Sequence, residues 1–269
     1  MSSHTETFRN LLAPGNFLIL ANAWDAGSAR IIELAGAPAI ATTSAGVAWA
    51  AGYPDGDALP IGVLTGIVER IARVISVPLT VDMEGGYSDD PRTAAANVLT
   101  VARAGGIGIN LEDGRGTPDL LCAKIAAIKE AAGKAGLDIF VNARTDVLLK
   151  RLVPAEGAME ETLARVARYK AAGADGIFVP MIKEPGDIAT VATAIDPLPL
   201  NVMAMPGVAP AGELKALGAR RLSAATGLSR AALAATKRLA AAFVKDGRSD
   251  ALYAQADDLG NLNALFPKN

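Results

Sequence analysis

Three short apolar runs each end in residues that could bind a metal or an acid. They end in Val81-Asp82-Met83-Glu84-Gly85-Gly86-Tyr87, in Glu112-Asp113-Gly114 and in Ala143-Arg144-Thr145-Asp146. Because Asp82 and Glu84 are two residues apart, their carboxylates would point the same way along an extended strand. If the three strands lie parallel in one sheet, the acids and Arg144 meet at one rim, where like-charged carboxylates need a cation. The pattern therefore predicts a site for a divalent, oxygen-preferring ion.

Strand-like and helix-like runs alternate along the whole chain, in eight pairs without a linker between them. We expect strands at 17–21, 39–43, 78–82, 108–112, 139–143, 176–180, 200–204 and 221–224. We expect helices at about 28–35, 60–74, 91–104, 119–132, 159–171, 185–194, 210–217 and 229–243. Eight alternating units with right-handed connections close into a (β/α)8 barrel, for which 269 residues suffice. The prediction is one α/β domain over residues 1–269, a TIM-type barrel with residues 246–269 as a C-terminal helical extension.

Composition narrows the classes of function. Apolar residues make up 51% of the chain and charged residues 20%, which favours a globular protein with a large core. The net charge of −2 and the absence of a basic cluster argue against a nucleic-acid partner. No signal-like start or long apolar run is present, so we expect a cytoplasmic protein without a membrane partner. The chain has one cysteine, Cys122, and one histidine, His4, and His4 lies in a terminus that we expect to be mobile. We therefore expect any catalysis to use carboxylates, arginine, hydroxyls and a metal ion.

Position within a barrel suggests a role for each polar residue, because the C-terminal ends of parallel strands form the active face. Mg²⁺ keeps several waters and takes one or two direct carboxylates, so Asp82 with Glu84 and Glu112 acting through water would suffice, and Mn²⁺ is a possible substitute. A solvated loop of acids is the alternative. Arg144 could bind the carboxylate of a small acid or form internal ion pairs with Glu112 or Asp146.

Five motifs in a fixed order resemble the isocitrate lyase and phosphoenolpyruvate mutase superfamily over roughly residues 17–243. They are Thr43-Ser44-Ala45-Gly46, Gly52-Tyr53-Pro54-Asp55, the segment 81–87, Leu111-Glu112-Asp113 and Asn142-Ala143-Arg144-Thr145-Asp146. This resemblance implies a (β/α)8 barrel that binds Mg²⁺ and an oxo-acid and that cleaves or rearranges a C–C or P–C bond beside a carboxylate. Members often form tetramers by exchanging their last barrel helix, so a homo-oligomer, a dimer or a tetramer, is expected.

The resemblance also implies a role for individual residues. Asp82 would bind the metal directly and contact the substrate, while Asp55, Glu84 and Glu112 would hold the waters of the metal. Ser44, Ala45 and Gly46 would bind the substrate. Arg144 would clamp its carboxylate. We expect Arg144, Glu112 and Tyr53 to be the catalytic residues; the sequence leaves the general base unassigned, with Tyr53 and a metal-bound water as the two candidates.

This chain departs from the family pattern at two places. Glu84 stands where the family usually carries aspartate, a change that keeps the charge and should keep metal binding. The mobile loop of the family's lyases, with its Lys-Lys/Arg-Cys-Gly-His motif, is replaced by Gly114-Arg115-Gly116-Thr117-Pro118, and Cys122 falls in the next helix. Both an isocitrate-type lyase and a true phosphonate mutase are therefore disfavoured, because each uses that loop.

The leading interpretation is a Mg²⁺-dependent lyase that acts on a small 2-oxo or 2-hydroxy acid. It would break a C–C bond, by retro-aldol cleavage or decarboxylation, through a metal-stabilised enolate. One alternative is a hydrolase or mutase of the P–C bond in a phosphonopyruvate-like substrate. Another is a barrel that binds an oxo-acid without converting it.

Overall fold

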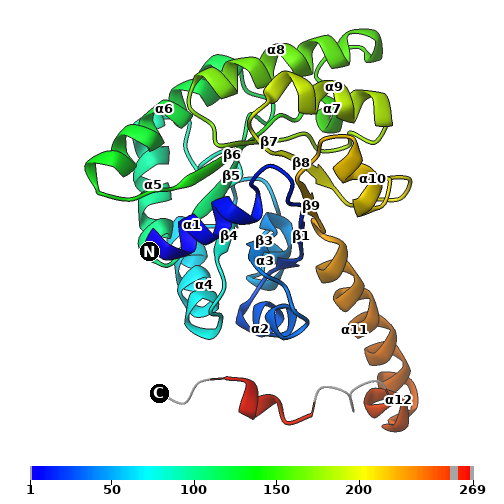
Figure 1. Ribbon diagram of the computed structural model, residues 1–269. Helices are drawn as coiled ribbons and strands as arrows, with labels where there is room; N and C mark the ends of the chain where they lie inside the picture. Colours follow the sequence, from blue (N-terminus) through cyan, green and yellow to red (C-terminus); the bar gives the residue numbers. More distant parts are fainter. Residues whose placement is uncertain (1, 255–259, 267–269) are drawn as a thin grey trace.

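The computed structural model describes residues 2–254 and 260–266, and its strands form one parallel sheet that closes on itself (Figure 1). The first barrel strand is split into β1 (Leu18–Leu20), which pairs with β9 (Arg221–Ser223), and β2 (Asn22–Ala23), which pairs with β3 (Ile40–Thr42). The sheet order β1-β9-β8-β7-β6-β5-β4-β3-β2 therefore describes a closed barrel of eight strands. The predicted TIM-type α/β barrel is confirmed.

The observed elements agree closely with the predicted ranges. The other strands are β4 (Leu79–Asp82), β5 (Gly108–Glu112), β6 (Phe140–Arg144), β7 (Gly176–Phe178) and β8 (Leu200–Met203). The outer helices are α2 (Ala26–Leu34), α4 (Ile61–Val74), α5 (Pro91–Arg103), α6 (Pro118–Lys134), α8 (Ala158–Ala171), α9 (Pro185–Ile195), α10 (Ala211–Ala216) and α11 (Gly227–Asp246). Shorter pieces are α7 (Val147–Lys150), η1 (Ala155–Gly157), α12 (Asp250–Tyr253) and η3 (Leu262–Leu265).

Local residue chemistry explains where the helices begin and end. Helices α5 and α6 both start with proline, and the side chains of Asp90 and Thr117 cap them by accepting from backbone N–H groups of the first turn. After α5 the chain turns at Gly105 with φ +118°, and a Cβ there would lie 2.6 Å from Cβ of Ala72. Glycine is therefore required both for the backbone conformation and for the packing of this turn.

The sequence did not reveal two helices. Helix α1 (Ser2–Leu11) covers the N-terminal end of the barrel, where the Phe8 and Phe140 rings meet edge to face with centroids 5.2 Å apart. Arg9 pairs with Asp138 at 2.7 Å and with Asp175 at 3.0 Å. The expectation of a mobile terminus around His4 is therefore wrong, because buried Phe8 and these ion pairs anchor the helix. Helix α3 (Ser44–Ala50) follows β3 directly.

Helix α11 leaves the barrel instead of packing beside β1, and the chain then returns toward α2 (Figure 1). Of its residues only Ser229 is buried, and on β1 the outward-facing side chain of Ile19 is 60% exposed. Farther on, Arg30 Nε donates to the carbonyl of Leu265 at 2.9 Å. The predicted extension begins where α11 ends, but its residues 255–259 and 267–269 lie outside the described part of the chain, and the division into one domain and an extension stays a prediction.

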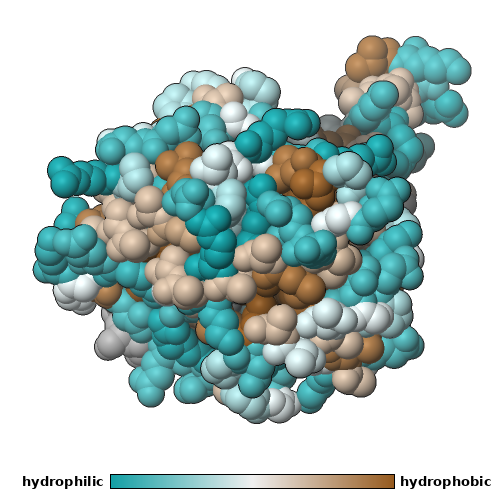
Figure 2. All heavy atoms as spheres, turned by 90° about the horizontal axis from the view of Figure 1, so that it is seen from above, coloured by the Kyte–Doolittle hydropathy of each residue, from teal (hydrophilic) through white to brown (hydrophobic). Residues whose placement is uncertain are grey.

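The surface is mixed in character. On the face in Figure 2 polar residues dominate, and apolar residues form small separate patches. No helix within residues 2–254 and 260–266 combines the length and the hydropathy needed to cross a bilayer.

Candidate active site

A cavity of about 270 Å³ lies at the C-terminal end of the barrel, and every barrel strand or the residue after it contributes to its lining. The contributors are Asn22, Thr43, Asp82, Asn110, Arg144, Phe178, Met203 and Ser223. Helices α3 and α7 add Ser44, Ala45 and Leu149, and loops add Asp55, Pro180, Ala225 and Thr226. We call this space the inner cavity. Its size suits a small acid better than a drug-sized ligand.

Asp82, the last residue of β4, is one of the polar residues that line the inner cavity. Its backbone N–H donates to Thr42 Oγ1 at 2.8 Å, and its carboxylate accepts from the backbone of Glu84 at 3.3 Å. The backbone N–H of Ser44 also donates to this carboxylate. Burial raises the pKa of Asp82, although the nearby charge of Arg144 acts in the opposite direction. A cation bound next to Asp82 would therefore lower this pKa and favour the ionised carboxylate.

Arg144 lines the inner cavity and is held by two acids. Its Nη1 lies 2.6 Å from Glu112 Oε2, and its Nε lies 2.7 Å from Asp146 Oδ1. Its guanidinium also stands 5.7 Å from the ring centre of Phe178. Burial alone would lower the pKa of Arg144, but Glu112 and Asp146 outweigh it and raise the pKa, so this group stays cationic. The internal ion pairs foreseen as one alternative are present, and they orient a guanidinium that still faces the cavity.

Glu112 pairs with Arg144 and lines a second, neighbouring cavity, but it is not among the residues that line the inner cavity. Its Oε1 accepts from Lys150 Nζ at 3.3 Å, and Lys150 also contacts Asp146 at 2.9 Å. Burial raises the pKa of Glu112 to about 7, even though Arg144 and Lys150 oppose the shift. Sequence reasoning missed Lys150, although its spacing of four residues from Asp146 on a helix could have indicated the pair.

The placement of Glu84 corrects the strand argument made for it. Strand β4 ends at Asp82, and Glu84 has φ +48°, so strand alternation does not extend to it. Its carboxylate instead accepts from the backbone of Asp57 and, at 3.0 Å, from Tyr87 Oη. Burial raises its pKa, with Asp55 and Asp57 adding to the shift. Glu84 is not among the residues that line the inner cavity, and its role beside a metal stays a prediction.

The structure brings some other predicted residues together and leaves others apart. Ser44, Ala45 and Asp55 line the inner cavity. Gly46 lies behind them in α3, where a Cβ would be 3.0 Å from Trp24 Cβ, and Tyr53 packs half-buried against the core. Neither Gly46 nor Tyr53 lines the cavity, so a substrate contact of the first and a catalytic role of the second stay predictions.

A buried hydrogen-bond network around Asp113 fixes the loop after β5 and was not foreseen. The Asp113 carboxylate accepts from Thr145 Oγ1 and from the backbone of Asp146, both at 2.8 Å. It also accepts from Arg165 Nη1 at 2.9 Å and from Tyr169 Oη at 2.6 Å. Because the donors come from two distant segments, no local pattern could have indicated the network. It couples the strand end that carries Glu112 to the one that carries Arg144.

A second polar feature lies inside the barrel, below the cavity. In the described part of the chain, all three guanidinium nitrogens of Arg221 and both side-chain polar atoms of Asn201 are buried without a hydrogen-bond partner. The two residues are neighbours in register between β8 and β9. Burial lowers the pKa of Arg221 to about 10, against the opposing charge of Asp82.

The carboxylates suit a hard cation that keeps most of its waters. No group of three or more histidine, cysteine, aspartate or glutamate residues within the described ranges is close enough to enclose a metal. Asp82 and Asp55 nevertheless face the same cavity, and the pKa of Asp82 is raised by burial. One or two direct carboxylates completed by water is the usual coordination of Mg²⁺, so the donor set fits that ion.

Comparison with known proteins decides the family. The family model described as phosphoenolpyruvate phosphomutase matches residues 8–244. The chain belongs to this family. The resemblance to the wider isocitrate lyase and phosphoenolpyruvate mutase superfamily is thereby confirmed, and its curated relatives with assigned activities include enzymes.

Three similar proteins illustrate the range of relatives. A Mycobacterium tuberculosis protein without a characterised activity is 36% identical over 90% of both chains. An oxaloacetate decarboxylase of Pseudomonas entomophila is 29% identical over 79% of this chain and 75% of its own. A Burkholderia cenocepacia structure, solved as a candidate phosphonomutase, superposes with a TM-score of 0.82 at 42% identity and covers 91% of this chain and 100% of its own.

Proposed function

We propose that this family member is a Mg²⁺-dependent carbon–carbon lyase that cleaves a small 2-oxo or 2-hydroxy acid, with decarboxylation of oxaloacetate as the first reaction to test. The observation that carries the proposal is the inner cavity, in which Asp82, Asp55 and Arg144 face one another in a space of about 270 Å³. The similarity to an oxaloacetate decarboxylase supports the choice of substrate.

The metal would be held by Asp82 directly and by Asp55, Glu84 and Glu112 through water, with Mn²⁺ as a possible substitute. When bound, Mg²⁺ would polarise the carbonyl and carboxylate oxygens of the acid. Arg144, which two acids keep cationic and oriented, would bind the carboxylate of the substrate and offset the negative charge that grows on its oxygens. Ser44 and Ala45 line the same space and would position the acid.

The anchored loop after β5 favours decarboxylation among the possible cleavages. When the bond between C3 and the outer carboxylate of oxaloacetate breaks, its electron pair stays with the pyruvate fragment and CO₂ leaves without receiving a proton. Water can then protonate the methylene carbon to give pyruvate. No acid on a mobile loop is needed, which agrees with a short loop whose Asp113 is fixed by four donors.

The direct test measures pyruvate release from oxaloacetate with and without Mg²⁺, after subtraction of the spontaneous reaction. We expect turnover that chelation abolishes, loss of Mg²⁺ binding in Asp82→Asn, and a fall in kcat/KM of roughly 100-fold in Arg144→Gln. An exposed substitution far from the cavity, Glu130→Gln on α6, is the control. Tight Mg²⁺ binding without turnover of oxaloacetate or any 2-hydroxy diacid would refute the lyase proposal.

A second candidate is hydrolysis of a P–C bond in a phosphonopyruvate-like acid. A second cavity of about 530 Å³ is lined by Glu112, the partner of Arg144, and would hold water beside the site. The similar Burkholderia cenocepacia protein supports phosphonate chemistry. Release of inorganic phosphate from phosphonopyruvate, with no pyruvate from oxaloacetate, would favour this candidate over the lyase.

We also propose that the chain forms a homo-oligomer in which α11 packs on a neighbouring subunit. Helix α11 exposes Leu228, Leu233, Phe243 and Val244, while β1 exposes Ile19 on its outer face. Burying such apolar surface stabilises association. Light scattering should measure the mass of a dimer or tetramer for the wild-type protein and a smaller mass for Leu233→Asp. A monomeric wild-type protein would refute the proposal that α11 packs on a neighbouring subunit.

A further inference from the structure

Asp55 reaches the inner cavity from an exposed segment that makes few hydrogen bonds. It lines the cavity, yet residues 54–58 are all exposed. Before the segment, the backbone N–H of Tyr53 donates into α3 at 2.8 Å, and after it Leu59 is buried. Among the described residues, Asp57 makes every hydrogen bond of residues 54–58. The position of Asp55 therefore depends on what holds Asp57.

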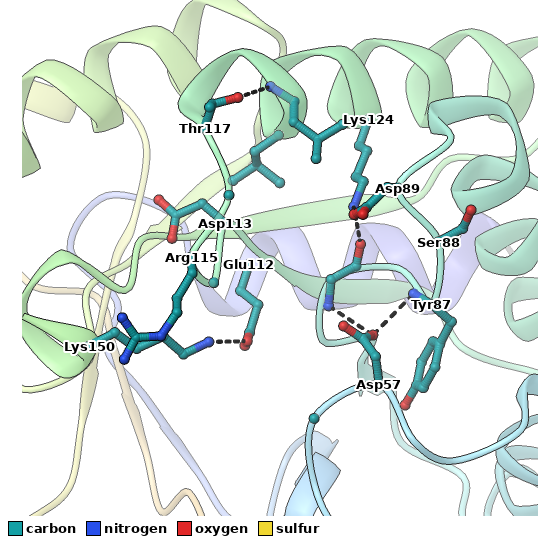
Figure 3. Close-up of a pocket in the computed structure, with 16 residues that line it drawn as sticks. Asp57, Tyr87, Ser88, Asp89, Glu112, Asp113, Arg115, Thr117, Lys124 and Lys150 are labelled. Atoms are coloured by element: carbon teal, nitrogen blue, oxygen red, sulfur yellow. Dashed lines mark hydrogen bonds and ion pairs between the residues drawn. The ribbon is translucent and has the colours of Figure 1, made fainter. Parts of the chain in front are cut away.

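Asp57 joins this segment to the loop after β4 through its backbone and its side chain. Its backbone N–H donates to the Glu84 carboxylate. Its Oδ1 accepts from the backbone N–H groups of Gly85 at 3.3 Å and of Tyr87 at 3.2 Å (Figure 3). The other carboxylate oxygen of Glu84 accepts from Tyr87 Oη at 3.0 Å, and Glu84 is buried. We call Asp57, Glu84 and Tyr87 the clasp, because together they connect two loops.

The loop after β4 is itself fixed to the barrel. Lys124 Nζ on α6 donates to the Gly85 carbonyl at 2.7 Å, and Asn97 Nδ2 on α5 donates to the Gly86 carbonyl at 3.0 Å. A Cβ on Gly85 would lie 2.9 Å from Asp57 Oδ2, so glycine at this position lets the two loops approach closely. The clasp therefore ties the segment that carries Asp55 to a rigid part of the molecule.

All three residues of the clasp have a left-handed backbone conformation. Their φ angles are +57° at Asp57, +48° at Glu84 and +57° at Tyr87. Within residues 2–254 and 260–266, six non-glycine residues have positive φ, so half of them lie in this one contact. Such conformations cost free energy and persist where the surrounding contacts fix them, which is common at functional sites. The concentration of strain indicates that the clasp has a role besides stability.

We propose that Asp57 and Tyr87 are positioning residues, which through the clasp hold Asp55 at the inner cavity so that its carboxylate binds a water of the Mg²⁺ ion. The inference rests on the proposed function, because it takes Asp55 as a residue that holds the waters of the metal. Neither Asp57 nor Tyr87 lines the inner cavity, so both would act through Asp55 and not on the substrate.

Hydrogen exchange and calorimetric titration with Mg²⁺ test the proposal together. Tyr87→Phe removes the hydroxyl that donates to Glu84, changes no charge and keeps the ring that packs against the core. We expect it to speed exchange of the Asp57 amide roughly 10-fold, followed in peptides by mass spectrometry, and to weaken Mg²⁺ binding roughly 3- to 10-fold. Asp57→Ala should likewise speed exchange of the Gly85 and Tyr87 amides. Tyr253→Phe, which removes an exposed hydroxyl on α12, should change neither measurement.

A double-mutant cycle shows whether the effect on Mg²⁺ passes through Asp55. Mg²⁺ binding should already be weaker in Asp55→Asn, and the addition of Tyr87→Phe should weaken it no further. If Tyr87→Phe has its full effect in that background as well, Tyr87 acts on the metal by another route, and the inference is overturned.

The remaining outcomes separate the inference from the proposed function. Faster exchange with unchanged Mg²⁺ binding would show that the clasp holds the loop without positioning Asp55. Unchanged exchange in both variants would show that the clasp does not hold the loop at all. Either result overturns the inference and leaves the proposed function standing. If the wild-type protein binds no Mg²⁺, the proposed function fails and the inference fails with it.

Discussion

Replacement of Asp113 by asparagine should destabilise the protein more than any exposed substitution. The Asp113 side chain is 0% exposed, and its two oxygens accept from Thr145, Asp146, Arg165 and Tyr169. An amide has one accepting oxygen, so its NH₂ group must face a donor in either orientation. The change also leaves the largely buried Arg165 without a full counter-charge on this side.

The size of the effect follows from these losses. Hydrogen bonds to charged groups contribute about 1.5–3 kcal/mol each, and breaking a buried ion pair costs about 3–5 kcal/mol. Since Arg165 keeps Glu161 at 2.6 Å, we expect a loss of about 3–5 kcal/mol in the free energy of unfolding, and not the sum of all four contacts. For a chain of this size the loss corresponds to a fall in Tm of roughly 6–20 °C.

Urea unfolding followed by circular dichroism measures the change. Tyr169→Phe removes one of the four donors to this carboxylate and should cost about 1.5–3 kcal/mol. Asp119→Asn removes an exposed aspartate that pairs with Arg168 and should leave the urea midpoint nearly unchanged. If Asp113→Asn costs no more than Tyr169→Phe, the network does not anchor the loop after β5.

Three further predictions concern other parts of the barrel. Burial raises the pKa of Glu112 from 4.5 to about 7. Between these two pH values only the folded state holds the proton, so in metal-free protein the free energy of unfolding should fall as pH rises from 4.5 to 7. In a pH series of urea titrations, Glu112→Gln should flatten this dependence. Gly46→Ala would put a Cβ 2.7 Å from Thr43 Cγ2 and should lower the free energy of unfolding in urea by about 1–3 kcal/mol. Gly66→Ala would meet nothing within 4 Å and should raise it by about 0.5–1 kcal/mol. Equal effects of the two substitutions would contradict the packing argument. Arg221→Met should raise the free energy of unfolding by about 1–4 kcal/mol, and a clear decrease in Tm would show that the buried guanidinium is compensated after all.

Sequence reasoning located the strand ends well and the side-chain directions less well. Asp82 and Arg144 were expected at one rim and do line one cavity, because parallel strands all end at the same face of a barrel. Glu84 was placed by strand alternation, but the strand ends two residues earlier and a positive φ redirects the chain. A rule of periodicity holds only while the backbone keeps its regular conformation.

The residues alone were sufficient to determine the alternating βα pattern, the closed barrel and the arrival of Asp82 and Arg144 at its C-terminal end. These features follow from hydrophobic periodicity and from the spacing of residues along the chain, which are local properties. Only the tertiary structure decided that Asp113 is bonded to Arg165 and Tyr169, that α1 covers the barrel floor, and that α11 leaves the barrel. Each of these depends on packing between segments far apart in the chain, where burial and hydrogen bonding with distant partners outweigh local preference.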